Sequence, residues 1–128
     1  MKKELQDKLF EKYPKIFRQK DLPKQQTAMC WGISCGDGWY EIIDMLCGCL
    51  QQHAKNSGKI IEAVQVKSKF GSLRFYAEGT GVDDFTRGLI RMAESISKQT
   101  KEWTDKEKFY KSTTDKSRRS SLPGELKI

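Results

Sequence analysis

Two short stretches of the chain combine residue types that could bind a ligand, and the first is CGDGWY at residues 35–40. A glycine-flanked turn that leads into a helix presents backbone N–H groups beside the positive end of the helix dipole, which favours anions. Asp37 is a good N-cap residue, so capping of the helix is one interpretation. In the other, Asp37 accepts a hydrogen bond from a base or a ribose while Trp39 or Tyr40 stacks on the ligand.

The second stretch places three cations and two aromatic residues close together: Lys67, Lys69, Phe70, Arg74 and Tyr76. Cations neutralise phosphate and aromatic rings stack on bases, which is the combination that nucleotide or single-strand recognition uses. The alternative interpretation is a solvated sheet face with cross-strand pairs of lysine and glutamate, and with Phe70 in the core.

The cysteines and the single histidine do not have the spacing of a metal or catalytic site. Cys30 and Cys35 are separated by four residues, whereas zinc knuckles usually have a C-x2-C spacing. Cys47 and Cys49 fall within a predicted helix, where residues two apart point about 200° apart. We expect the cysteines to be small buried hydrophobic residues and His53 to be structural or exposed. The sequence therefore predicts a protein without catalytic residues, metal or cofactor.

The elements that position these stretches are predicted from periodicity and punctuation. Apolar spacing of three and four residues predicts helices over about 38–55 and 82–101, with a short N-terminal helix over residues 2–12. Alternation and β-branched residues predict a hairpin over about 59–78, and a further strand over about 27–34 is weakened by Gly32. The expected class is α+β: a small antiparallel sheet packed with two main helices.

Charge and length limit the domain organisation and the kinds of partner that we expect. The 128 residues carry 24 Lys/Arg and 17 Asp/Glu, a formal net charge of +7, of which +4 lies from Lys98 onward. We expect one domain over 1–103 and a basic tail over 104–128, either solvated or used as a docking arm. No apolar run could span a membrane and no signal peptide is recognisable, so we expect a cytoplasmic protein. The positive balance favours anionic partners.

Three segments in order resemble a family of small phage and prophage proteins. They are KYPKIF at residues 12–17, MCWGISCGDGWY at 29–40 and QVKSKFGSLRFY at 65–76. Members of that family look like KYP-x-LF, WG-x-x-CGDGW and QVKEKFG-x-LRFY, and AES at residues 93–95 matches a further stretch. Many members continue into a C-x-x-C-G pair, but this chain has KQTKEW at 98–103, so a zinc site is not carried over. The resemblance implies a viral setting and no particular reaction.

Small phage proteins often act against host defence, and the resemblance therefore implies a role of that kind. The expected function is non-catalytic sequestration of a nucleotide signal, with Lys69 and Arg74 on phosphate and with Trp39, Phe70 or Tyr76 stacked on the base. One alternative is an inhibitor that docks on a host defence protein such as a CRISPR effector. Another is DNA or RNA binding through the basic hairpin and tail. A pocket for a small molecule in so small a domain could need an oligomer interface.

Overall fold

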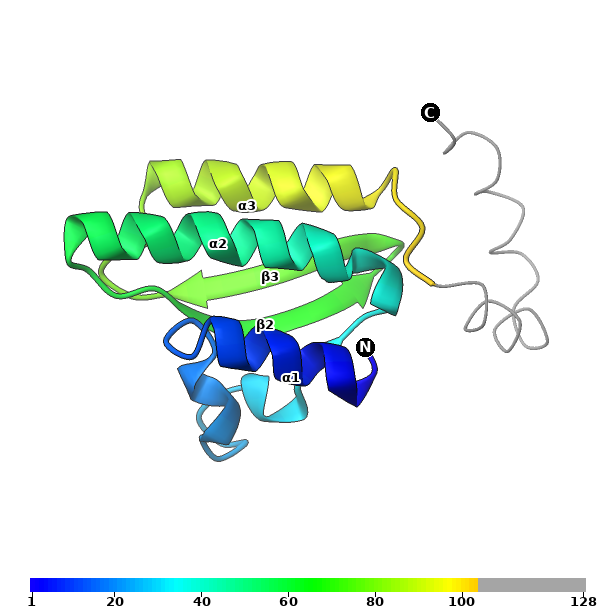
Figure 1. The fold of residues 1–128 in the computed structure, drawn as a ribbon, viewed down its shortest axis with the longest axis horizontal. Helices are drawn as coiled ribbons and strands as arrows, with labels where there is room; N and C mark the ends of the chain where they lie inside the picture. The colour runs from blue at the N-terminus through cyan, green and yellow to red at the C-terminus, as the bar shows by residue number, and fades with distance from the viewer. Residues whose placement is uncertain (104–128) are drawn as a thin grey trace.

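The computed structural model describes residues 1–103, and the predicted basic tail lies outside the described residues. The expected α+β class is confirmed (Figure 1). The elements, in chain order, are α1 (Lys3–Lys12), the 3-10 helices η1 (Arg18–Asp21) and η2 (Met29–Trp31), β1 (Ile33–Ser34), the 3-10 helix η3 (Asp37–Trp39), α2 (Tyr40–Ser57), β2 (Glu62–Lys69), β3 (Ser72–Glu78) and α3 (Asp84–Ser97). No helix of the described part is long and apolar enough to cross a bilayer.

The sheet has three strands in the order β1-β2-β3. The predicted hairpin is confirmed, because β2 and β3 pair in antiparallel fashion. The predicted third strand shrinks to Ile33–Ser34 and pairs in parallel with β2, so the sheet is mixed rather than antiparallel. The physical reason is the connection: α2 carries the chain from the end of β1 back to the start of β2, as a parallel crossover requires.

Two helices cover one face of the sheet. Figure 1 shows α2 and α3 running antiparallel to each other over β2 and β3, with α1 below them. Each strand alternates between this covered face and the opposite one. The covered face contributes Val66, Leu73 and Phe75, each at most 2% exposed, and packs on Ile43 and Leu50 of α2.

Helix α2 ends at a left-handed glycine but begins without a side-chain cap. The chain leaves α2 at Gly58 in the left-handed conformation, which glycine adopts without strain. At the start of α2, the expected cap by Asp37 is wrong: Trp39 is the N-cap residue and makes no side-chain cap. Asp37 lies two residues earlier, in η3, and its carboxylate accepts a hydrogen bond from the backbone N–H of Lys2 at 2.8 Å.

Helix α3 begins with a reciprocal cap. The Asp83 carboxylate accepts from the backbone N–H of Thr86 at 2.9 Å, and the Thr86 hydroxyl accepts from the N–H of Asp83 at 2.8 Å. The helix ends at Ser97 rather than near residue 101, because the following residues leave as a strap. We use "the strap" for residues 98–103.

The strap packs against the glycine-flanked turn. The backbone N–H of Gly38 donates to the carbonyl of Glu102 at 2.7 Å, and the Trp39 indole N–H donates to the carbonyl of Thr100 at 3.0 Å. A Cβ on Gly36 or Gly38 would lie 2.2 Å or 2.0 Å from a strap carbonyl oxygen. The two glycines are therefore required by the close approach of the strap backbone.

Replacing Gly38 should loosen this contact. We expect Gly38→Ala to lower the free energy of unfolding by about 2 kcal/mol, because the added methyl overpacks a backbone contact. Gly48 in α2 is the matched control, since a Cβ there meets only the Tyr13 hydroxyl at an ordinary 3.5 Å and alanine favours a helix interior by about 1 kcal/mol. Urea denaturation of both variants measures the difference, and equal effects of the two substitutions would contradict this account of the strap.

The cap of α3 should make stability depend on pH in the acid range. The N–H of Thr86 and then the neighbouring His53 lower the pKa of Asp83 to about 2 from an ordinary value of 3.8. Because the pKa is lower in the folded chain, the ionised carboxylate stabilises the fold above about pH 4, and this contribution is lost as the pH falls toward 2. Asp83→Asn keeps a capping oxygen but does not titrate, so the wild-type advantage at pH 6 should narrow by pH 2.5. Denaturation midpoints measure it, and an unchanged gap would refute the assignment.

Candidate functional site

The uncovered face of the hairpin collects the cationic residues of the second stretch. The strand register places Lys67 directly opposite Arg74 and Gln65 opposite Tyr76, on the face away from α2 and α3. Their neighbours Val66 and Phe75 point into the core. We use "the hairpin surface" for Lys67, Lys69, Phe70, Arg74 and Tyr76.

The hairpin surface brings like charges together without a counter-charge. No hydrogen bond or ion pair connects the Lys67 ammonium or the Arg74 guanidinium to a carboxylate within residues 1–103. The Nε of Arg74 is screened from solvent and has no hydrogen-bond partner in that same part of the chain. Like charges directly opposite each other destabilise a sheet, and buried donors are nearly always paired. An anion between the two strands would relieve both penalties.

Phe70 occupies the tip of the hairpin in an unfavourable conformation. It is 90% exposed, and its φ of +54° is followed by a φ of +75° at Gly71. Two consecutive positive φ values form the two-residue loop that favours Asn-Gly or Asp-Gly, whereas a bulky residue there is strained. The alternative interpretation, with Phe70 in the core, is therefore wrong, because a residue at the tip of a two-residue loop points away from both strands.

Two further contacts define the surface around Phe70. The Lys69 ammonium lies 5.6 Å from the centre of the Phe70 ring, within the range of a cation–π interaction. Tyr76 is 42% exposed on the same strand and face as Arg74. Exposed rings therefore flank the cationic pair on both sides, along the length of the hairpin.

The first stretch lies at the same end of the molecule but is occupied by the chain itself. Figure 1 shows η3, the N-terminus, the strap and the hairpin tip at one end of the fold. Trp39 is 1% exposed, so no base can stack on it, and the Asp37 carboxylate already holds the N–H of Lys2. Tyr40 is half-buried and packs against the core. The structure thus assigns these three residues to the fold rather than to an open ligand site.

The cysteines and histidine occupy separate places. Cys35 and Cys47 are buried, and burial raises the pKa of the Cys47 thiol well above its ordinary value. Cys49 is exposed, contrary to the expectation of burial, because it lies on the outer side of α2. His53 is 3.0 Å from the Asp83 carboxylate and its ring centre is 4.8 Å from that of Phe85. Within residues 1–103, no His, Cys, Asp and Glu side chains gather into a group that could hold a metal ion.

A basic cavity of about 870 Å³ lies between the turn after α1, the end of α2 and the start of β2. Its lining includes Lys15, Arg18, Lys55 and Lys59. Its carboxylate, Glu62, is held by Arg18, whose guanidinium lowers the pKa of Glu62. The exposed Ile60 and the buried Ile61 form an apolar part of the cavity wall. This combination could accept a small anion.

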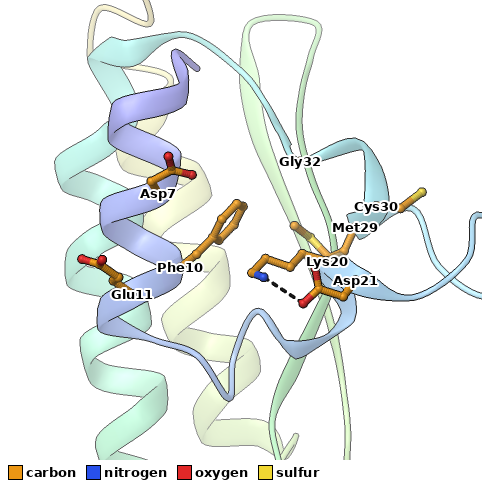
Figure 2. A pocket seen from close by; sticks show the side chains of 8 residues that line it. All are labelled: Asp7, Phe10, Glu11, Lys20, Asp21, Met29, Cys30 and Gly32. Carbon is orange, nitrogen blue, oxygen red and sulfur yellow. Dashed lines mark hydrogen bonds and ion pairs between the residues drawn. The ribbon is translucent and has the colours of Figure 1, made fainter.

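A second cavity, of about 540 Å³, has the opposite charge. It lies between α1 and the η1–η2 segment, and Figure 2 shows Phe10 pointing toward the ion pair of Lys20 and Asp21. Asp7 and Glu11 add two more carboxylates to its lining. Because its lining has three carboxylates and one lysine, this cavity disfavours an anionic ligand, whereas the basic cavity favours one.

No protein-family model matches the chain, and neither a curated protein nor a solved structure does. The candidate site is therefore the hairpin surface on the strength of its own residues. Sequence reasoning missed the lysines of the basic cavity, because they come from segments 40 residues apart (Lys15 and Lys55) and have no shared motif. The only available signal was their position directly beside predicted element ends, after Pro14 and around Gly58.

Relieving the strain at Phe70 should stabilise the chain. Asparagine tolerates a positive φ much better than phenylalanine, and the exposed ring loses little burial when it is removed. We expect Phe70→Asn to raise the free energy of unfolding by about 1 kcal/mol. Thermal and urea denaturation measure it. A clear loss of stability would contradict this prediction, because it would mean that the Phe70 ring stabilises the fold.

Proposed function

We propose that this protein binds a nucleotide-class ligand on the hairpin surface, without catalysis. The single observation that carries the proposal is the Lys67–Arg74 pair, which lies directly cross-strand without a carboxylate partner among the described residues. A phosphate group between the two side chains would supply the missing negative charge. The planar guanidinium of Arg74 suits bidentate contact with phosphate oxygens.

The aromatic residues support bases rather than inorganic phosphate as the rest of the ligand. Phe70 and Tyr76 present ring faces that could each stack on a base, and stacking is tolerant of base identity. Tyr76 lies four residues after Ser72, which follows the turn, and four residues of strand rise by about 14 Å. One base cannot stack on both rings at that separation. The spacing therefore favours a short oligonucleotide, either a single strand or an oligonucleotide signal, over a mononucleotide.

In the viral setting that the resemblance implies, binding without turnover would lower the free concentration of a host nucleotide signal. The basic cavity favours a second version of this function, in which a small anionic nucleotide enters a concave site. A docking role on a host defence protein would use the same exposed Phe70 and cations against an acidic surface. The cavity version predicts different sensitive residues, whereas the docking version predicts the same residues with a protein partner in place of a nucleotide.

A binding titration with matched variants separates them. The probes are a fluorescently labelled single-stranded octanucleotide, followed by anisotropy, and a mononucleotide, followed by calorimetry. Lys67→Ser with Arg74→Ser removes the cationic pair, and Lys8→Ser with Lys24→Ser removes the same charge from exposed positions on α1 and the loop after η1. Lys55→Ser with Lys59→Ser removes the same charge from the basic cavity.

We expect the hairpin variant to bind the octanucleotide at least tenfold more weakly, while the α1–loop control changes little. Removing two phosphate contacts should also reduce the slope of log affinity against log salt by about 1.4. Phe70→Asn should weaken binding although it stabilises the fold. Loss of mononucleotide binding in the cavity variant alone would move the site to the cavity. Equal binding by the hairpin variant and the α1–loop control, or no binding of either probe by wild type, would refute the proposal.

A further inference from the structure

Helix α3 exposes a stripe of large apolar side chains. Phe85, Met92 and Ile96 are 58%, 61% and 46% exposed, and Leu89 is half-buried between them. At about 100° per residue, these four positions fall within a sector of about 60° on the helix. The buried residues Thr86 and Ala93 lie on the adjacent side of α3, about 80° around the helix from the centre of the stripe, where α3 contacts β3 and α2. The stripe is therefore a second apolar face, additional to the one that builds the core.

Helix α2 widens this face. The ring of His53 contacts Phe85, and Met45 and Cys49 lie on the same side of α2, eight and four residues before His53. Met45 is 65% exposed and Cys49 is also exposed. An apolar surface that extends over two helices is larger than the scattered single residues normal on a protein surface. We use "the helix face" for Met45, Phe85, Leu89, Met92 and Ile96.

We infer that the helix face binds a second copy of this chain, with the two α3 helices antiparallel. The spacing of Phe85, Leu89, Met92 and Ile96 is four, three and four residues, which reads the same in both directions. A two-fold axis between residues 90 and 91 therefore places Phe85 against Ile96 of the second copy. The same axis places Leu89 against Met92. Such an arrangement is self-complementary, as a two-fold dimer requires.

The charges at the two ends of α3 favour the antiparallel direction. Asp83 and Asp84 begin the helix, and the exposed Lys98 follows its last residue. The Asp84 side chain is fully exposed and 3.3 Å from Arg87, itself exposed. Antiparallel helices place the acidic end of one copy beside the basic end of the other, and their dipoles oppose each other favourably. A parallel arrangement would instead bring like charges together.

Gly88 supports close approach of the two helices. It lies in the middle of α3 at an exposed position beside the stripe, and a Cβ there would meet nothing within 4 Å in the chain. Glycine destabilises a helix interior by about 1 kcal/mol relative to alanine, and no contact within the described residues requires it. A second helix can approach closely at this position because glycine has no side chain there.

The helix face and the hairpin surface lie on opposite sides of the sheet, so both can be occupied at once. A dimer would carry two outward hairpin surfaces. Dimerisation does not depend on the proposed nucleotide-class ligand, and its test contains none. The result therefore stands whether or not the hairpin surface binds nucleotides.

Sedimentation equilibrium of the full 128-residue chain over a range of concentrations tests the inference. We expect a monomer–dimer equilibrium in the wild type and a monomer in Met92→Lys, in which an exposed helix position becomes charged. Trp31→Lys is the matched control: Trp31 is 68% exposed on η2, away from the helix face, and its replacement should leave dimerisation unchanged. Circular dichroism verifies that each variant is folded.

A charge exchange tests the antiparallel direction. Asp84→Lys and Lys98→Asp should each weaken the dimer about two- to threefold at low salt, because both charges are exposed beside the interface, and the double variant should recover most of the loss. A wild-type chain that stays monomeric up to about 1 mM would overturn the inference. Equal dimerisation of wild type and Met92→Lys would overturn it too, and failure of the double variant to recover would overturn the antiparallel arrangement.

Discussion

The arrangement of this fold depends on one buried carboxylate. Glu102 is 6% exposed, and its two oxygens accept hydrogen bonds from the backbone N–H of Gly36 and the hydroxyl of Ser68, each at 3.0 Å. A carboxylate taken out of water is unfavourable unless such donors satisfy it. Because its donors follow β1 and end β2, Glu102 fixes the strap to the end of the sheet at which the hairpin turns. The position of the hairpin tip relative to η3 and the N-terminus follows from this contact.

The same contact decides which predicted residues remain open to a ligand. The strap approaches so closely that Gly36 and Gly38 have no room for a side chain, and it receives the Trp39 indole. The turn that looked like an anion site is thus a site for the chain's own backbone and carboxylate. The hairpin surface is left as the exposed part of the two stretches. Within residues 1–103, no carboxylate forms an ion pair with Lys67 or Arg74 of this surface, and the rings of Phe70 and Tyr76 are exposed.

Local sequence patterns predicted the helices, the hairpin and the alternation of its faces, because these follow from residue spacing within one segment. The role of Asp37 could not be predicted in this way, since its partner Lys2 lies 35 residues away and the strap's Glu102 lies 66 residues from Gly36. Phe70 shows a different limit: its residue type left a core position and an exposed position both open, and the two-residue turn decides for the exposed one. The short parallel strand β1 depends on where α2 returns the chain, which no local pattern specifies.

Three features depart from what local physical chemistry prefers: like charges face each other at Lys67 and Arg74, Phe70 has a positive φ, and Gly88 interrupts the middle of a helix. Each lowers stability by roughly 0.5–2 kcal/mol, which is appreciable against the 5–15 kcal/mol that holds a typical domain together. Where the described chain supplies no compensating contact, an external one becomes the simplest explanation. An anion compensates the charge pair, a stacked or packed group covers the strained ring, and a neighbouring helix uses the space at the glycine. All three departures lie on the surface, on two separate faces, so they point to binding partners and not to the requirements of the core.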